Sequence, residues 1–129
     1  MKSHTPSDIH PPFARYAHGV EVPSGYRTLF VSGQLGIDAA AQVPGAAGDQ
    51  ADLCFANARA VLAAAGMGPG DVVRVNAFVT DRAHLPEYMA ARDRFFADVA
   101  APPASTLMIV AGFARPEFKV EVELVAAAR

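Results

Sequence analysis

The chain of 129 residues contains no tryptophan and a single cysteine, Cys54. One cysteine excludes a disulfide within the chain, as is usual in proteins of a reducing compartment. Residues 1–12 lack the apolar stretch of a signal peptide. Long hydrophobic runs are also lacking, because those near residues 60–65 and 107–113 are far shorter than the roughly 20 residues that cross a bilayer. We expect a cytoplasmic protein with no membrane partner.

An excess of positive charge is lacking too. The sequence has 11 Lys and Arg against 13 Asp and Glu, a formal net charge of -2. Proteins that bind nucleic acid concentrate basic residues on one face, so we expect no nucleic-acid partner. The four histidines (His4, His10, His18 and His84) show no metal-ligand spacing. There is no phosphate loop, nucleophile elbow or dinucleotide fingerprint, and we expect neither a metal nor a cofactor.

The composition is that of a globular protein, with 52% hydrophobic and 19% charged residues. Its length suits a single domain over residues 1–129. The polar, proline-bearing residues 1–12 are expected to form a flexible N-terminal tail.

The periodicity of the apolar residues predicts an α+β fold. The predicted order is strand 16–22, strand 28–32, helix 49–65, strand 72–79, helix 85–96, strand 106–110 and strand 118–126. The first two strands are expected to form a hairpin through residues 23–25, and Gly66 to end the first helix. This ββαβαββ order predicts a mixed sheet with both helices on one face.

Two of the strands are apolar on both sides. Residues 106–110 read TLMIV, and residues 72–79 carry Val73, Val75, Ala77 and Val79 on one face with Val72 and Phe78 on the other. Such strands are normally buried on both faces. Because two helices cover one face only, we expect the other to pack on another subunit.

The last strand carries the first candidate for chemistry. Lys119, Glu121 and Glu123 alternate with apolar residues and share one face. Carboxylates at a subunit boundary are costly without partners, so one of them could act as a general base or position a water molecule. A solvated strand face explains the same pattern, and both interpretations stay open.

Small and polar residues at two strand ends offer weaker signals. At Ser32 and Gly33, glycine would let a ligand approach the backbone, although a tight turn explains it equally. Ser105 and Thr106 could bind a polar ligand or satisfy backbone groups where their strand begins. Cys54 is expected to be a small buried apolar residue.

Five ordered segments resemble the RidA (YjgF) family. They are SGQLGID at 32–38, the helix with Asn57 ending in LAAAGM at 62–67, DVVRVNAFVTD at 71–81, PAST at 103–106 and KVEVELVA at 119–126. The resemblance covers about residues 11–126. It implies a chorismate-mutase-like α+β fold, a homotrimer and ligand clefts between adjacent subunits. Characterised enzymes of this family hydrolyse 2-imino acids, or their enamine tautomers, to 2-keto acids and ammonia.

The resemblance also implies roles for individual residues. Tyr16 matches a tyrosine of the cleft, and Ser32 and Gly33 match the strand end that contacts the ligand. Glu121 matches the glutamate that positions the attacking water. Glu123 matches a second glutamate, which we interpret as structural.

Other positions depart from the family pattern. The arginine that clamps the substrate carboxylate is replaced by Ser105, a cysteine by Leu107, and an asparagine of the second helix by Met89. We expect Ser105 and Thr106 to bind a neutral or differently placed group. Arg15 could supply a replacement cation, or could be a surface arginine where a strand begins.

Three functions follow from the resemblance. The leading hypothesis is a hydrolytic deaminase of an imine, an enamine or a related small reactive metabolite, with an atypical substrate. The alternative is a non-catalytic trimer that binds or senses a small molecule in the same clefts. The ribonuclease or translation-inhibitor activity attached to the family's names fits poorly with a net charge of -2.

Overall fold

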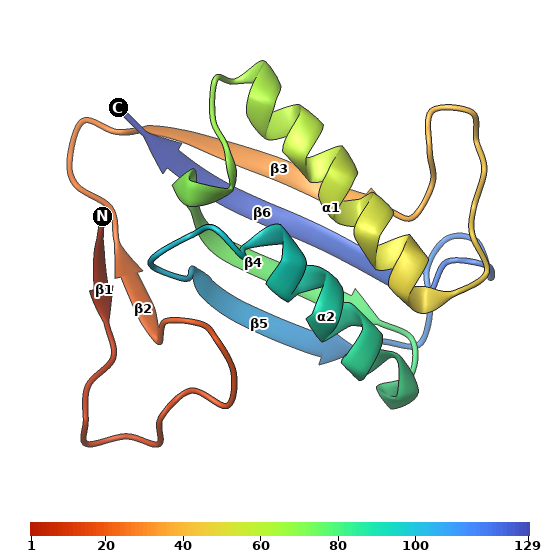
Figure 1. Ribbon diagram of the computed structural model, residues 1–129, viewed down its shortest axis with the longest axis horizontal. Helices are drawn as coiled ribbons and strands as arrows, with labels where there is room; N and C mark the ends of the chain where they lie inside the picture. The colour runs from red at the N-terminus through yellow and green to blue at the C-terminus, as the bar shows by residue number, and fades with distance from the viewer.

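The computed structural model describes residues 1–129, which form an α+β fold (Figure 1). In chain order the elements are β1 (Lys2–His4), β2 (Gly19–Glu21), β3 (Arg27–Leu35), α1 (Ala47–Ala64), the 3-10 turn η1 (Pro69–Asp71), β4 (Val72–Val79), the 3-10 turn η2 (Arg82–His84), α2 (Leu85–Phe95), β5 (Ala104–Ile109) and β6 (Val120–Ala128). No helix is both long enough and apolar enough to span a membrane.

The main sheet has four strands in the order β3-β6-β4-β5. β6 runs antiparallel to β3 and β4, whereas β4 and β5 are parallel. The parallel pair needs a crossover, which α2 provides. The mixed sheet predicted from the sequence is therefore confirmed.

Both helices cover the same face of this sheet, as predicted (Figure 1). α1 ends where expected, because Gly66 takes a positive φ of 71° and its N–H donates to the carbonyl of Ala63 at 2.9 Å. The core between helices and sheet contains aromatic and aliphatic residues from the helices and aliphatic residues from the strands, including Phe55, Leu62, Val75, Ala77, Val79, Tyr88, Phe95, Val120, Val122 and Leu124.

The predicted hairpin of residues 16–22 with 28–32 is wrong. Only Gly19–Glu21 form a strand in the first segment, and they pair with β1 rather than with β3. The reason is that the segment before β2 pairs with the start of β5 instead. The N–H of Ala17 donates to the carbonyl of Pro103 at 3.0 Å, beside the first residue of that strand. In the order β3-β6-β4-β5 that edge is the far side of the sheet from β3.

The expected N-terminal tail contains the short strand β1, whose residues Lys2–His4 pair with Glu21–Gly19. The side chain of His4 also bonds to the carboxylate of Glu21 at 2.8 Å. β1 and β2 form a separate two-stranded ribbon beside the main sheet (Figure 1).

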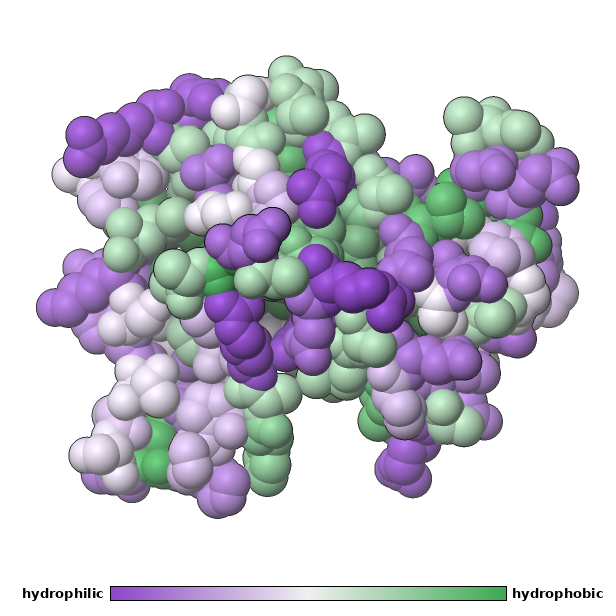
Figure 2. Space-filling view, viewed as in Figure 1, coloured by the Kyte–Doolittle hydropathy of each residue, from purple (hydrophilic) through white to green (hydrophobic).

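The two faces of the molecule differ in character. On the helix side, polar side chains are interspersed with apolar ones, and no broad apolar patch interrupts them (Figure 2). The opposite face of the sheet is not covered by any element of the chain, and Phe30 of β3 is 77% exposed and Met108 of β5 51% exposed. A single chain thus leaves large apolar side chains in water on its sheet face.

Candidate functional site

Glu121 and Glu123 project from β6 onto the uncovered face of the sheet. Their neighbours Val120, Val122 and Leu124 are buried under the helices, so the predicted alternation of this strand is confirmed. Both glutamates are partly buried although nothing packs above them.

A bulge in β3 creates the space for Glu121. The register of β3 against β6 shifts between Val31 and Gln34, which leaves Ser32 and Gly33 in the irregular segment. A Cβ atom at Gly33 would lie 2.7 Å from Cδ of Glu121 and closer still to Oε1. Glycine is therefore needed here for the close approach of the Glu121 side chain, a role that neither interpretation of Gly33 included.

The surroundings of Glu121 raise the pKa of its carboxyl group. The largest cause is partial removal from water, and the negative charge of Glu123 adds to it. A carboxylate with a raised pKa is a stronger proton acceptor than an ordinary glutamate. Such a group can remove a proton from water when a substrate holds that water in place.

Glu123 has a partner that the sequence analysis did not single out. Nδ2 of Asn76 donates to its Oε1 at 3.1 Å, while Oδ1 of Asn76 is buried without a hydrogen-bond partner. A hollow of about 210 Å³ lies beside this pair, lined in part by Phe30 and Ser32. The one signal for Asn76 is its place as the only uncharged polar residue within β4.

β5 divides its predicted residues between the two faces of the sheet. Ser105 pairs with the core residue Val75, and Leu107 with Ala77, so both side chains lie on the helix side. Thr106 pairs with Asn76 and lies on the uncovered face. Its hydroxyl oxygen accepts a bond of 2.8 Å from the guanidinium of Arg74.

Met89 belongs to the same side as Ser105. It lies on α2, is partly buried, and packs against the core, as Leu107 does. Ser105, Leu107 and Met89 are thus separated by the sheet from Ser32 and Glu121.

Tyr16 and Arg15 lie in the segment that precedes β2. The hydroxyl of Tyr16 accepts a bond of 3.2 Å from the N–H of Phe13. The guanidinium of Arg15 donates to the carbonyl of Phe96 at 2.9 Å and to that of Val99, just beyond the end of α2. These bonds give Arg15 a structural partner at the end of a helix.

Cys54 is fully buried in α1, as expected, and its thiol contacts the carbonyl of Val120 at 3.6 Å. Burial, with a smaller contribution from Glu121, raises the pKa of the thiol to about 12. A thiol in this state is unreactive at neutral pH. No group of three or more His, Cys, Asp or Glu side chains that could hold a metal ion occurs in the chain.

Comparison with known protein families places this geometry in context. The sequence model of the family described as endoribonuclease L-PSP matches residues 8–128. The chain belongs to this family, the RidA (YjgF) family.

Individual members of the RidA family agree with this assignment. The Rid-family protein YyfB of Yersinia pestis has a solved structure with a TM-score of 0.87, 32% identity and coverage of 98% of both chains. Protein DfrA of Myxococcus xanthus is 35% identical over 113 residues, 86% of this chain and 83% of its own length. A 2-iminobutanoate/2-iminopropanoate deaminase of Dermatophagoides farinae is 32% identical over 87 residues, 66% of each chain.

The RidA fold thus brings together only part of the predicted site within one chain. Ser32, Gly33, Glu121 and Thr106 share the uncovered face, whereas Ser105 shares the helix side with the two apolar positions. Tyr16 lies in the segment beside the start of the edge strand β5, where its neighbour Ala17 pairs with Ala104.

Proposed function

We propose that this protein is a hydrolytic deaminase of a small imine or enamine, acting in clefts between the subunits of a homotrimer. The observation that carries the proposal is the environment of Glu121. Its carboxyl group has a raised pKa and packs against Gly33, on the face of the sheet that no other element covers. Membership of the RidA family and the name of the deaminase relative support the same reaction class.

A cleft between two subunits would bring together the two groups of predicted site residues, those on the uncovered face and those on the helix side. Glu121 and Ser105 lie on opposite faces of one sheet, so a substrate cannot reach both within a single chain. A neighbouring copy could bring its β5 edge to the uncovered face, where the exposed Phe30 and Met108 also need cover. The substrate would then contact Glu121 of one copy and Ser105 of the next.

In this mechanism Glu121 accepts a proton from a water molecule as its oxygen bonds to the carbon of the C=N group. The nitrogen takes up a proton, which gives a tetrahedral carbon with one hydroxyl and one amino group. The hydroxyl proton then passes through Glu121 to the amino nitrogen as the C–N bond breaks, which releases ammonia and leaves a C=O group. One water molecule is consumed, and no oxidant or metal is needed.

Ser105 suggests which substrates are favoured. An arginine at this position would form two charge-assisted bonds to one carboxylate, whereas a serine hydroxyl offers one neutral donor. The difference corresponds to roughly tenfold to a hundredfold weaker binding of a small 2-imino acid. We therefore infer that the substrate is less charged, and that Leu107 and Met89 favour an apolar group.

A coupled assay tests the proposal. An amino-acid oxidase generates 2-imino acids with different side chains, semicarbazide traps the imine that survives, and neutral imines are assayed in parallel. We expect the wild type to accelerate loss of a neutral or apolar imine, and Ser105→Arg to shift the preference toward 2-imino acids. Glu121→Gln should reduce turnover at least about a hundredfold without lowering the melting temperature.

Two outcomes would count against this mechanism. If Glu121→Gln retains full turnover, the carboxylate has no part in it. If no imine is turned over by the wild type or by Ser105→Arg, while a small molecule still raises the melting temperature, the chain is a ligand-binding trimer. The serine at position 105 is the observation that favours this second function.

A further inference from the structure

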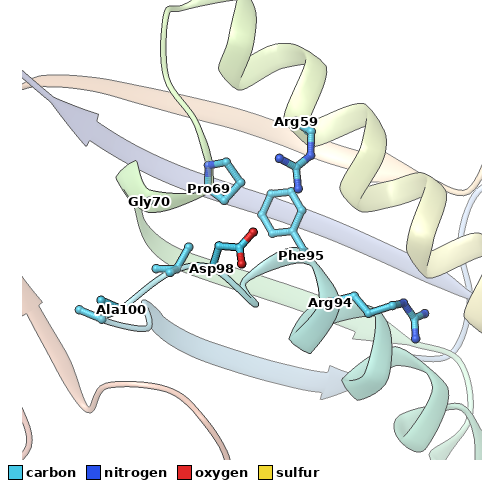
Figure 3. Close-up of a pocket in the computed structure, with 9 residues that line it drawn as sticks. Arg59, Pro69, Gly70, Arg94, Phe95, Asp98 and Ala100 are labelled. Atoms are coloured by element: carbon cyan, nitrogen blue, oxygen red, sulfur yellow. The ribbon is translucent and has the colours of Figure 1, made fainter.

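The largest hollow in the protein lies away from the sheet face, on the helix side (Figure 3). Its volume is about 510 Å³, within the range of roughly 300–1,000 Å³ that is usual for small-molecule sites. Its walls come from α1, η1, the end of α2 and the turn that follows, through Arg59, Pro69, Gly70, Phe95, Asp98 and Val99. We call this hollow the helix groove.

The helix groove contains one cation without an ionic partner. The guanidinium of Arg59 lies over the ring of Phe95, 4.9 Å from its centroid, and has no hydrogen-bonded or ion-paired partner in the chain. Its neighbour Arg94 differs, because it is neutralised by Asp52 through bonds of 2.9 and 3.1 Å. Arg94 also lines the groove, but in Figure 3 its side chain extends away from Asp98.

The groove also contains one anion without a partner. The carboxylate of Asp98 forms no ion pair and no hydrogen bond with the rest of the chain, Arg59 included, although both residues line the same hollow. In the view of Figure 3 the ring of Phe95 lies between the Arg59 and Asp98 side chains. The groove thus presents an apolar surface with two opposite charges that form no ion pair with each other.

We propose that the helix groove binds a small zwitterion, a free amino acid whose carboxylate bonds to Arg59 and whose ammonium group bonds to Asp98. A guanidinium recognises a carboxylate through paired donors, and a carboxylate accepts bonds from an ammonium group. The carbon chain of the ligand would lie on Phe95 and Pro69. This site is separate from the proposed deaminase site and does not depend on that function, because the two sites share no lining residue.

The first test uses the wild-type protein and a series of unbranched amino acids: glycine, β-alanine, 4-aminobutanoate and 6-aminohexanoate. Binding is followed by NMR of backbone amides and the Arg59 Nε–H group. At least one member should shift Gly70, Asp98 and Arg59 saturably, with a Kd of about 1 mM, near -4 kcal/mol. The acid and the amine of matching length, each with one charge, should bind at least about tenfold more weakly.

Variants provide the second test. Arg59→Gln and Asp98→Asn should each weaken binding of that amino acid about tenfold or more. The exposed residues Arg82 and Asp8 lie outside the groove, so Arg82→Gln and Asp8→Asn should bind as the wild type does. Glu121→Gln should also bind normally, which separates this site from the proposed deaminase site.

Three results would overturn the proposal. They are the absence of saturable shifts with every zwitterion up to about 50 mM, far above the expected Kd; equal binding of the singly charged analogues; and unchanged affinity in both groove variants. A dipeptide that binds while no free amino acid does would also reject it, and would identify a peptide end as the ligand. Melting temperatures of the variants exclude misfolding as the cause of any loss.

Discussion

Gly33 and Gly36 each allow a close contact that a Cβ atom would block, but the two contacts have different roles. At Gly33 a Cβ atom would meet the side chain of Glu121, which is partly exposed and has room to move. At Gly36 it would lie 2.7 Å from Cα of Gln50, a backbone atom of α1. The first glycine therefore positions a polar side chain, and the second lets a helix approach a strand.

We expect Gly33→Ala to reduce imine turnover at least about tenfold while leaving the free energy of unfolding nearly unchanged, because only Glu121 has to shift. Gly36→Ala should instead destabilise the protein by about 1–3 kcal/mol, since α1 must move away from the strand. Urea unfolding and the imine assay, applied to both variants, measure the contrast. An equal loss of stability in both variants would contradict the role given to Gly33.

The raised pKa of Glu121 predicts a pH dependence. As a base, Glu121 must be ionised, so turnover should fall as the pH decreases through its pKa. Glu123→Gln removes a neighbouring negative charge and should lower the pKa of Glu121, which moves the acid limb of the pH–rate profile to lower pH. Glu21→Gln, on β2, is the control. An acid limb that stays in place in Glu123→Gln would contradict the coupling.

The raised pKa of Glu121 also makes the free energy of unfolding depend on pH. Because the folded protein holds the Glu121 proton more tightly than the unfolded chain does, this group favours folding most at pH values below the unfolded pKa. That contribution is lost as the pH rises through the folded pKa. Glu121 therefore costs stability at neutral pH, as is common for groups at functional sites.

At the scale of elements, Gln50 connects α1 to the segments on either side of it. Its Nε2 donates to the carbonyls of Pro44 and Glu117 at 2.9 Å each, and its Oε1 accepts from the N–H of Lys119 at 2.8 Å. The side chain is fully buried and all its bonds go to backbone groups. It thereby fixes the start of α1 against the entry to β6.

We expect Gln50→Met, which keeps the volume of the side chain, to destabilise the protein by about 2–4 kcal/mol, because buried backbone groups lose their partners. Gln42→Met, at an exposed glutamine, should change stability by less than about 0.5 kcal/mol. Urea unfolding of both variants makes the comparison. A value for Gln50→Met as small as that for Gln42→Met would mean that water replaces the lost bonds.

The elements with a clear period were predictable from the sequence. The strand at Val72–Val79 has the predicted ends, and the helix beginning at Leu85 ends one residue before the prediction. Within β4, however, the core contains Val72 rather than Val73, because a bulge shifts the register against β6 between Val72 and Arg74. A bulge changes which face a side chain occupies without changing the composition of the strand.

The candidate site was less predictable than the fold. The resemblance to the family singled out Glu121 and Gly33, but spacing along the chain does not show that they touch. Asn76 was missed because one amide within a strand is no motif by itself. The separation of Ser105 from Glu121 depends on how β4 pairs with both neighbours, a long-range property that local patterns do not contain.

At the scale of the whole molecule, one face of the sheet is covered by other elements of the chain and the opposite face is not. The helices bury the first, while the second exposes Phe30 and Met108 and carries the partly buried Glu121 and Glu123. Soluble monomers seldom expose large apolar side chains on an uncovered sheet face.

We expect the wild-type protein to have about three times the mass of one chain in solution, as proposed for a homotrimer. Phe30→Ser should weaken the assembly so that single chains appear on dilution, because it removes an apolar side chain from the face that must be covered. Phe13 is 87% exposed but lies off the sheet, and Phe13→Ser should remain trimeric. Light scattering coupled to gel filtration measures each mass; a monomeric wild type would refute the expectation.

The bonds around Arg15 have a consequence for the timing of local motions. Arg15 donates to carbonyls beyond α2, and Arg92 of α2 donates in return to the carbonyl of Arg15 at 3.0 Å. The segment that carries Tyr16 therefore cannot detach without breaking these bonds to α2 and the turn after it, so we expect the two to open as one cooperative unit. Their amide hydrogens are expected to exchange with solvent at correlated rates, set by a shared opening equilibrium.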